Sequence, residues 1–227
     1  MIIKHASGIS GASSASGPTV VIDVFRAYSA AAYAFAAGAT QIVLAADVDE
    51  ARQLATGIDG SVLMGEVDGV RPEGFALGNS PGELEASPHL VHGRTIIHRS
   101  SAGTRCARAA LDNGASPLYV ASLVVASATA AAIADFPEVT LVASGLSGVG
   151  PALEDDICAG VLTDLLLGGD ADLAAGAEAV AATDRAKLLK TASFAHPSDV
   201  RLCSAVDRFD FAMMATVTAD GVAIHKV

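Results

Sequence analysis

The sequence is poor in charge, in aromatic rings and above all in basic residues. Only 17% of its 227 residues are charged, 4% are aromatic and tryptophan is absent, while 52% are hydrophobic. That apolar share excludes a disordered chain. With 14 Lys and Arg against 25 Asp and Glu, the formal net charge is −11, which argues against nucleic acid as a main partner. Any anion that the protein handles must therefore be bound locally, by placed arginines, backbone N–H groups or a metal ion.

Cysteines and long hydrophobic runs are also scarce. Cys106, Cys158 and Cys203 are an odd number and form no CxxC pair, which excludes a disulfide framework and a zinc ribbon. The most apolar stretches, 30–37 and 120–134, are shorter than the roughly 18 residues that a membrane span needs. The N-terminus lacks the apolar core of a signal peptide. We expect a soluble cytoplasmic protein with no membrane partner.

Short β-rich runs alternate along the chain with Ala-rich helical patterns. The expected strands are 19–22, 41–45, 61–64, 94–98, 118–121 and 139–143. The expected helices are 27–38, 47–57, 102–113 and 124–135. Apolar runs without alternation suit strands that are buried on both faces, and strands that alternate with helices form βαβ units. The pattern predicts a three-layer α/β/α fold with a mostly parallel sheet, and no linker or repeat divides residues 1–227 into more than one domain.

The pattern changes after residue 150. Two helical stretches, 153–167 and 173–189, follow each other with no strand between them. The runs 209–216 and 222–226 then flank Asp220-Gly221, and Asp-Gly is a hairpin signal. We expect these last strands to extend the sheet in antiparallel fashion or to form a small appended layer.

Ligands of an open α/β sheet bind outside the carboxyl ends of its strands, where loops and helix N-termini converge. This rule selects the segments that follow the expected strands, namely 23–26, Gly65-Glu66, 99–105, Ser122 and Ser144-Gly145. Together they carry carboxylates, arginines and several small hydroxyl or glycine residues. We therefore expect one crevice in which these groups face each other.

Asp23 and Glu66 each follow an apolar strand, where an unpaired carboxylate would be costly to bury. A hard divalent cation would satisfy both groups, since Mg²⁺ is commonly held by one or two carboxylates together with water and substrate oxygens. Asp23 could equally cap the helix that follows or pair with Arg26. The residues alone leave both interpretations open.

The loop after the fourth expected strand is rich in small residues. It contains Ser100, Ser101, Gly103 and Thr104 and ends on Arg105. Its backbone N–H groups could surround a phosphate or sulfonate, with the arginine as a bidentate donor. The alternative is an ordinary Ser-rich helix cap. The loop has no Gly-Lys-Ser/Thr sequence, which disfavours a nucleoside triphosphate.

A third acidic element, Glu154, Asp155 and Asp156, lies at the start of the expected helix 153–167. Acidic residues in a first turn complement the helix dipole, which is their ordinary explanation. If this segment folds over the crevice, one of the three acids could instead be a third metal ligand or a general base. His98 ends an expected strand and is a further candidate for the crevice.

Several of these segments together resemble the 2-phosphosulfolactate phosphatase family. The similar segments are Asp-Val-Phe-Arg-Ala at 23–27, Gly-Glu at 65–66, Gly-Phe-Ala-Leu-Gly-Asn-Ser-Pro at 74–81, Gly-Thr-Arg at 103–105 and Glu-Asp-Asp-Ile-Cys-Ala-Gly at 154–160. The segment at 74–81 is the most specific of them. The resemblance implies a three-layer α/β/α fold, in agreement with the alternation of strands and helices.

The resemblance also implies a Mg²⁺-dependent phosphatase that hydrolyses 2-phosphosulfolactate to 3-sulfolactate and phosphate, a step of coenzyme M biosynthesis. The expected metal ligands are Asp23, Glu66 and either Asp155 or Asp156, and the expected catalytic set is Asp23, Glu66, Asp155 and Arg105. The residues expected to bind substrate are Arg26, Asn79, Ser80, Ser100, Ser101, Gly103, Thr104 and Arg105. Position 25 is Phe, so the DxD pair of the aspartyl-phosphate phosphatases is missing, which favours attack by activated water.

Two departures from the family pattern bear on the substrate. Asn is common in the family where this chain has Ala102, and Arg often stands at the position of Val67. Loss of these polar groups would weaken the hold on a sulfonate or phosphate, so a phosphatase for another small phosphorylated hydroxy acid is an alternative. A non-catalytic protein that binds small anions is a second one. An Ala-rich surface with few lysines makes a homodimer plausible.

Overall fold

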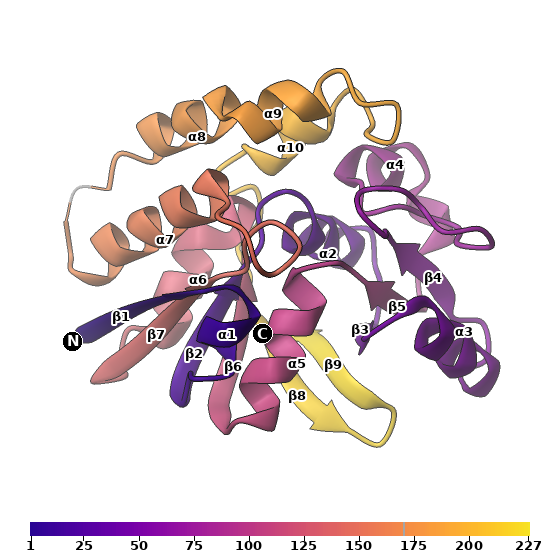
Figure 1. The fold of residues 1–227 in the computed structure, drawn as a ribbon, viewed down its shortest axis with the longest axis horizontal. Coiled ribbons are helices and arrows are strands. Elements are labelled where there is room, and N and C mark those ends of the chain that lie inside the picture. Colours follow the sequence, from indigo (N-terminus) through magenta and orange to yellow (C-terminus); the bar gives the residue numbers. More distant parts are fainter. Residues whose placement is uncertain (170) are drawn as a thin grey trace.

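The computed structural model describes residues 1–169 and 171–227, and it contains a nine-stranded sheet with helices around it (Figure 1). The strands are β1 (Ile2–Ser7), β2 (Gly17–Ile22), β3 (Gln41–Ala45), β4 (Val62–Gly65), β5 (Thr95–Arg99), β6 (Ala115–Ala121), β7 (Glu138–Ala143), β8 (Met213–Thr218) and β9 (Gly221–Lys226). The helices are α1 (Gly8–Ala12), α2 (Ala27–Ala36), α3 (Val48–Gly57), α4 (Pro81–Ala86), α5 (Gly103–Asp112), α6 (Ala126–Ile133), α7 (Leu153–Leu166), α8 (Leu173–Ala182), α9 (Asp184–Leu189) and α10 (Asp199–Cys203). Short 3-10 helices span Pro88–Leu90 and Leu123–Val125.

The sheet consists of two parallel halves joined by a hairpin. Its strand order is β1-β7-β2-β6-β8-β9-β3-β5-β4, and every pairing is parallel except those that involve β8 or β9. The C-terminal hairpin is antiparallel, as the Asp-Gly turn predicts, but it lies in the middle of the sheet rather than at an edge. The carboxyl ends of β2 and β5, one from each half, still meet, since the Gly103 N–H after β5 donates to Asp23 after β2.

Helices cover both faces because the central strands bury side chains on both. In β2, Val20 and Ile22 pack with α6 and α7, whereas Val21 belongs to the cluster that contains α2 and α5. Successive side chains of a strand point to opposite faces, so an uninterrupted apolar run requires a layer of helices on each side. This is the predicted three-layer α/β/α arrangement.

Most element types agree with the sequence pattern, and the differences have local causes. Asp47 caps α3, with its Oδ1 accepting the Glu50 N–H at 2.8 Å, as their spacing indicates. The expected helix 173–189 is two helices, because the Thr183 backbone is extended (ψ 157°) and its hydroxyl accepts the Ala186 N–H at 3.1 Å to begin α9. The pattern does not predict β1, since polar residues interrupt its apolar run at the edge of the sheet.

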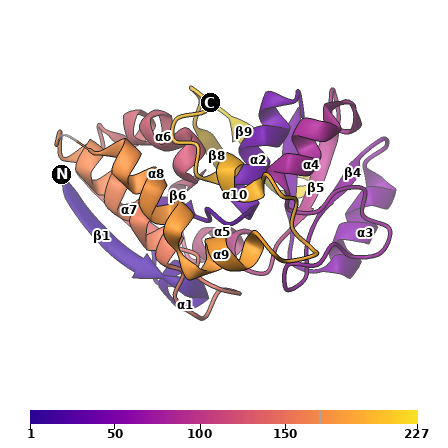
Figure 2. The same cartoon turned by 90° about the horizontal axis from the view of Figure 1, so that it is seen from above.

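The helices α8, α9 and α10 lie above the end of the sheet where the strands of the first half finish (Figures 1 and 2). α8 packs closely on α7, so that a Cβ at Gly176 would lie 2.8 Å from Val161 Cγ2. α9 and α10 share a small buried cluster of Ala186, Leu189 and Val200. Throughout the described residues, helices are too short or too polar to cross a bilayer. The C-terminal helices thus add a wall above the crevice.

Candidate active site

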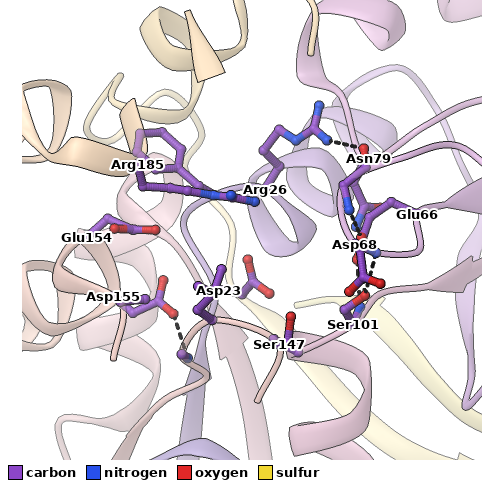
Figure 3. A pocket seen from close by; sticks show the side chains of 16 residues that line it. Asp23, Arg26, Glu66, Asp68, Asn79, Ser101, Ser147, Glu154, Asp155 and Arg185 are labelled. Atoms are coloured by element: carbon purple, nitrogen blue, oxygen red, sulfur yellow. Dashed lines mark hydrogen bonds between the residues drawn. The ribbon is translucent and has the colours of Figure 1, made fainter. Parts of the chain in front are cut away.

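A pocket of about 230 Å³ opens where the two halves of the sheet meet (Figure 3). It is lined by Asp23, Phe25, Arg26, Glu66, Asp68, Gly69, Asn79, Ser101, Ala102, Gly145, Leu146, Ser147, Ala152, Glu154, Asp155 and Arg185. These residues follow β2, β4, β5 or β7, or belong to α7 and α9. The pocket therefore lies at the carboxyl ends of the strands, as the sequence predicts.

Asp23 lies at the end of β2 and is 5% exposed. Its Oδ1 accepts the N–H of Ala27 and its Oδ2 the N–H of Gly103, both at 3.0 Å. A Cβ at Gly103 would lie 2.8 Å from that Oδ2, so glycine is what lets α5 begin this close. Asp23 therefore does cap a helix, whereas Arg26 pairs with Asp199 instead. Capping leaves a further lone pair on each carboxylate oxygen.

Asp155 is held in the first turn of α7 by donors from two strand ends. Its Oδ1 accepts the Val24 N–H after β2 at 2.8 Å. Its Oδ2 accepts the Gly145 N–H at 3.0 Å and the Ser144 hydroxyl at 3.1 Å, both after β7. The carboxylate thus ties α7 to the ends of both strands.

Glu66 joins the loop after β4 to the loop after β5. Its Oε1 accepts the Ser101 N–H at 2.6 Å, and its Oε2 accepts the Ser101 hydroxyl at 3.2 Å and the Gly69 N–H at 2.5 Å. Glu66 and Glu154 lie on opposite sides of the pocket, with Asp23 between them (Figure 3). The acids of the site therefore surround its interior rather than share one edge.

Burial raises the pKa of several of these acids. Burial, followed by the charge of Glu66, raises the pKa of Asp23 from 3.8 to about 6, although its backbone donors oppose the shift. Burial and the charge of Asp23 likewise raise the pKa of Asp155 well above its usual value, and the pKa of Glu154. The lining includes five carboxylates and two arginines. A bound cation would relieve this excess of negative charge.

Arg26 lines the pocket but uses most of its hydrogen-bonding capacity on the protein. Its Nη1 donates to Asp199 Oδ2 at 2.9 Å and to the Phe194 carbonyl at 3.3 Å. Its Nη2 donates to the Gly69 carbonyl at 3.0 Å. Asp199 also accepts the Ser80 hydroxyl at 2.7 Å. This buried network fastens α2, α4, α10 and the loop after β4 to one another.

Asn79 lines the pocket and is oriented by a buried histidine. His98 in β5 is fully buried, and its Nε2 lies 2.6 Å from Asn79 Oδ1. Burial lowers the pKa of His98 to about 3, so the ring is neutral. Because an amide oxygen only accepts, we assign the ring proton to Nε2, which leaves the Asn79 NH₂ group to donate elsewhere. His98 thus lies behind the crevice rather than in it.

The structure brings together half of the predicted site residues. The pocket is lined by Asp23, Arg26, Glu66, Asn79, Ser101 and Asp155. The pocket is not lined by Ser80, Ser100, Gly103, Thr104, Arg105 or Asp156. Whether each lining residue takes part in binding or catalysis stays a prediction.

The predicted residues outside the pocket either form hydrogen bonds at the start of a helix or lie on the solvent-facing side of one. Ser100 and Thr104 hold the start of α5, each hydroxyl accepting the other residue's N–H at 3.0 Å. The N-cap residue itself is Ala102, which has no side-chain capping bond. Ser80 accepts the Glu83 N–H at 3.1 Å and so begins α4. Arg105 and Asp156 lie on the exposed faces of α5 and α7.

Three polar lining residues escape the sequence analysis, namely Asp68, Ser147 and Arg185. Ser147 lies in a glycine-rich stretch and has a φ of 52°, a conformation that is uncommon for a residue with a Cβ. Its position in that stretch after an expected strand is a signal that could have found it. Arg185 gives no local signal, because its place over the pocket depends on how α9 packs.

Comparison with known proteins points to one family. A family model described as 2-phosphosulpholactate phosphatase matches residues 6–216. A protein of Prochlorococcus marinus (strain MIT 9313) named probable 2-phosphosulfolactate phosphatase is 36% identical over 211 residues, or 83% of this chain and 85% of that protein. Proteins with the same name from Synechococcus sp. (strain RCC307) and Gloeobacter violaceus (strain ATCC 29082 / PCC 7421) are 36% and 33% identical. These matches cover 83% and 91% of this chain, and 84% and 90% of the two proteins.

The family match includes every residue that lines the pocket. It thus agrees with the resemblance that the motifs at 23–27, 74–81 and 154–160 carry. The chain belongs to the 2-phosphosulfolactate phosphatase family.

Proposed function

We propose that this protein hydrolyses 2-phosphosulfolactate to 3-sulfolactate and phosphate, and that it uses Mg²⁺. The observation that supports the chemistry most is the arrangement of charge in one small pocket. Asp23, Glu66 and Asp155 gather at the strand ends, and two arginines lie on the wall above them. A small substrate with several anionic groups suits the arginines, and a divalent cation would offset its repulsion by the acids. The name of the relatives, probable 2-phosphosulfolactate phosphatase, supports the choice of substrate.

The acids fit a hard cation that the protein shares with substrate and water. Among residues 1–169 and 171–227, no three Asp, Glu, His or Cys side chains come close enough to enclose a metal ion by themselves. Mg²⁺ commonly needs only one or two carboxylates. Each Asp23 oxygen and Glu66 Oε1 accept a single hydrogen bond and so keep a lone pair for it. We assign these two residues as the ligands, with Asp155 adding negative charge beside Asp23. When bound, Mg²⁺ would supply Lewis-acid polarisation of the phosphoryl group.

Glu154 is our candidate for the base that takes a proton from the attacking water. Its side chain is 4% exposed and lines the pocket, and it forms no hydrogen bond with another residue of the described chain. Because burial raises its pKa, Glu154 is a stronger base than an exposed glutamate. The water oxygen bonds to phosphorus and its proton passes to Glu154. The bond from phosphorus to the ester oxygen breaks, and that oxygen takes a proton from solvent.

Attack by water is favoured over attack by a carboxylate. Phe25 lines the pocket at the position where an aspartyl-phosphate phosphatase has its second Asp. Both Asp23 oxygens also accept backbone N–H groups, which hold the carboxylate in place. Rapid-quench kinetics should therefore show 3-sulfolactate and phosphate formed together, with no burst of 3-sulfolactate ahead of phosphate. An acyl phosphate trapped on Asp23 would contradict this mechanism.

One lining residue favours a second candidate function. Ala102 lines the pocket, whereas Val67, the other departure from the family pattern, does not. A pocket that has a methyl group in place of an amide there offers one donor fewer to a sulfonate. A phosphatase for another small phosphorylated hydroxy acid is therefore the alternative.

The test is phosphate release from racemic 2-phosphosulfolactate, 2-phospholactate and 3-phosphoglycerate, each with Mg²⁺ and with a chelator. We expect Mg²⁺-dependent turnover with the highest kcat/KM for 2-phosphosulfolactate. Turnover of only the other two acids would support the alternative substrate. Saturable binding without turnover of any of them would identify an anion-binding protein instead.

The biological setting stays a set of predictions. A role in coenzyme M biosynthesis follows from the proposed reaction. The cytoplasmic location is expected from the cysteine pattern and from the sequence's lack of a signal-peptide pattern, and the homodimer from an Ala-rich surface with few lysines. Gel filtration with light scattering would test the homodimer, which should give twice the mass of one chain.

A further inference from the structure

The two arginines of the pocket differ in what they already bind. Arg26 donates to one carboxylate and two carbonyls, and its side chain is 4% exposed. Arg185 is half-buried and lines the same pocket, yet its side chain forms no hydrogen bond or ion pair with any residue that the structure describes. Figure 3 shows its side chain reaching over the pocket beside Arg26. Arg185 is therefore the guanidinium whose donors are available to a ligand.

The backbone beneath Arg185 is firmly held. Its neighbour Ala186 is fully buried in a cluster with Leu189 and Val200, against which Phe25 of the pocket wall also packs. Thr183 caps this turn of α9. A long side chain on a fixed helix can bind an oxyanion at a defined place with little reorganisation of the backbone.

The charges around Arg185 leave it free for a ligand. Its other neighbour Asp184 points to solvent and pairs with Lys187 at 2.8 Å. The charge of Arg185 lowers the pKa of Glu154, although burial outweighs this effect. No ion pair joins these two side chains in the described part of the chain. The guanidinium thus stands at one side of a pocket whose acids, Asp23 and Glu66, lie farther in (Figure 3).

We propose that Arg185 binds an anionic group of the substrate that is not transferred, either the sulfonate or the carboxylate. It would thereby determine specificity for phosphomonoesters that carry an anionic group besides the phosphate. This inference rests on the proposed function, because it assumes that the phosphoryl group lies against Asp23 and Glu66. A planar guanidinium donates two parallel hydrogen bonds to such a group. A phosphomonoester without a second anion has nothing to offer Arg185.

The test is Arg185→Gln, with kcat and KM measured on 2-phosphosulfolactate and on phenyl phosphate. Loss of the hydrogen bonds from the guanidinium to the substrate anion should lower kcat/KM for 2-phosphosulfolactate about 10- to 100-fold, mainly by raising KM. The value for phenyl phosphate should stay within about twofold. Arg185→Lys should restore part of the loss, and Lys187→Gln, on the same helix but turned to solvent, should behave as wild type. Circular dichroism should show the same melting temperature for all three variants.

Equal losses on both substrates would overturn the inference, since Arg185 would then act on the phosphoryl group, and so would no loss on either. Calorimetry with 3-sulfolactate gives a second measure that needs no turnover. Wild type should bind this product about 10-fold or more tightly than Arg185→Gln. If wild type releases no phosphate, the proposed function fails while calorimetry still decides the role of Arg185. Equal affinity of the two proteins, or no binding to either, would contradict that role.

Discussion

The acids around Asp23, namely Asp23 itself and Asp155, are buried to a similar degree as the ion pair of Arg26 with Asp199. The two groups differ in the hydrogen-bond and charge partners of their carboxylates. Asp199 faces a guanidinium at 2.9 Å as well as neutral donors. Asp23 and Asp155 accept hydrogen bonds from backbone N–H groups and a hydroxyl only. The ion pair of Arg26 with Asp199 thus contains its own countercharge, whereas the acids around Asp23 have none among their hydrogen-bond partners.

This difference separates a structural role from a binding role. A buried ion pair fastens elements together and gains little from a ligand. A buried carboxylate without a cation has a raised pKa and gains from any cation that reaches it. Burial of a charged residue is therefore a poor guide to function by itself, and the identity of its partners is a better one.

The largest effect on activity should come from Asp23, whose carboxylate has no countercharge. Asp23→Asn removes the charge and turns an NH₂ group toward one of two backbone donors, so kcat should fall about 10³-fold or more. Phosphate release at saturating substrate measures it. Asp47→Asn, a surface helix cap, is the control and should keep full activity. A variant at position 23 with more than about a tenth of wild-type kcat would contradict the account.

Loss of the ion pair of Arg26 with Asp199 should lower the stability of the protein. Asp199→Asn leaves the guanidinium of Arg26 buried without a counter-ion, so the free energy of unfolding should fall by about 3–5 kcal/mol. Urea denaturation measures this change. Asp184→Asn breaks an exposed pair with Lys187, so its effect on the free energy of unfolding should be far smaller. An equal decrease in the free energy of unfolding for the two variants would show that the ion pair of Arg26 with Asp199 does not stabilise the fold as we describe.

Stability without divalent cations should depend on pH through Asp23. Its pKa is about 6 in the folded protein and 3.8 in the reference state, so the folded state holds the proton more tightly. The resulting stabilisation is fully present below pH 3.8 and is lost as the pH rises through about 6. It amounts to about 3 kcal/mol. Denaturation curves across this range should show a smaller decline for Asp23→Asn, and equal slopes would rule out this contribution.

The smallest effect should come from Arg105, which belongs neither to the acids around Asp23 nor to the ion pair of Arg26 with Asp199. Arg105 is exposed, and its Nη1 donates to the Ser101 carbonyl at 3.5 Å from the outer side of α5. Arg105→Gln should therefore change kcat/KM for 2-phosphosulfolactate by less than about twofold, although the sequence makes it a catalytic candidate. Parallel kinetics with Arg185→Gln compare the two arginines directly, and a larger loss for Arg105→Gln would reverse our assignment.

The strand ends of the site could be predicted because their chemistry is local. An apolar run that ends in Asp23 or in Glu66 marks both a buried strand and a carboxylate at its carboxyl end. The same logic finds Ser101 in the loop after β5, whereas Asn79 is expected only from the resemblance of residues 74–81 to the family. Asp23, Glu66 and Ser101 share the property that a single strand and the turn after it place them.

The remaining parts of the site depend on helical phase and on distant contacts. Residues 105 and 156 lie next to buried positions in α5 and α7, and a shift of one residue turns a side chain from the pocket to solvent. The place of Arg185 depends on how α9 packs on α10, and the pairing of Arg26 with Asp199 joins residues 173 positions apart. The hairpin between the two half-sheets is likewise a long-range choice that a turn signal cannot specify.

The most direct test of the central claim is the melting temperature of the protein at pH 7.5 with and without 10 mM Mg²⁺, for wild type and Asp23→Asn. If the acids around Asp23 bind a cation, Mg²⁺ at about 100 times its Kd should stabilise wild type by about 2.7 kcal/mol. This should raise the melting temperature by several degrees. The Asp23→Asn variant should respond by less than about one degree. No shift in wild type, or the same shift in both proteins, would contradict the account.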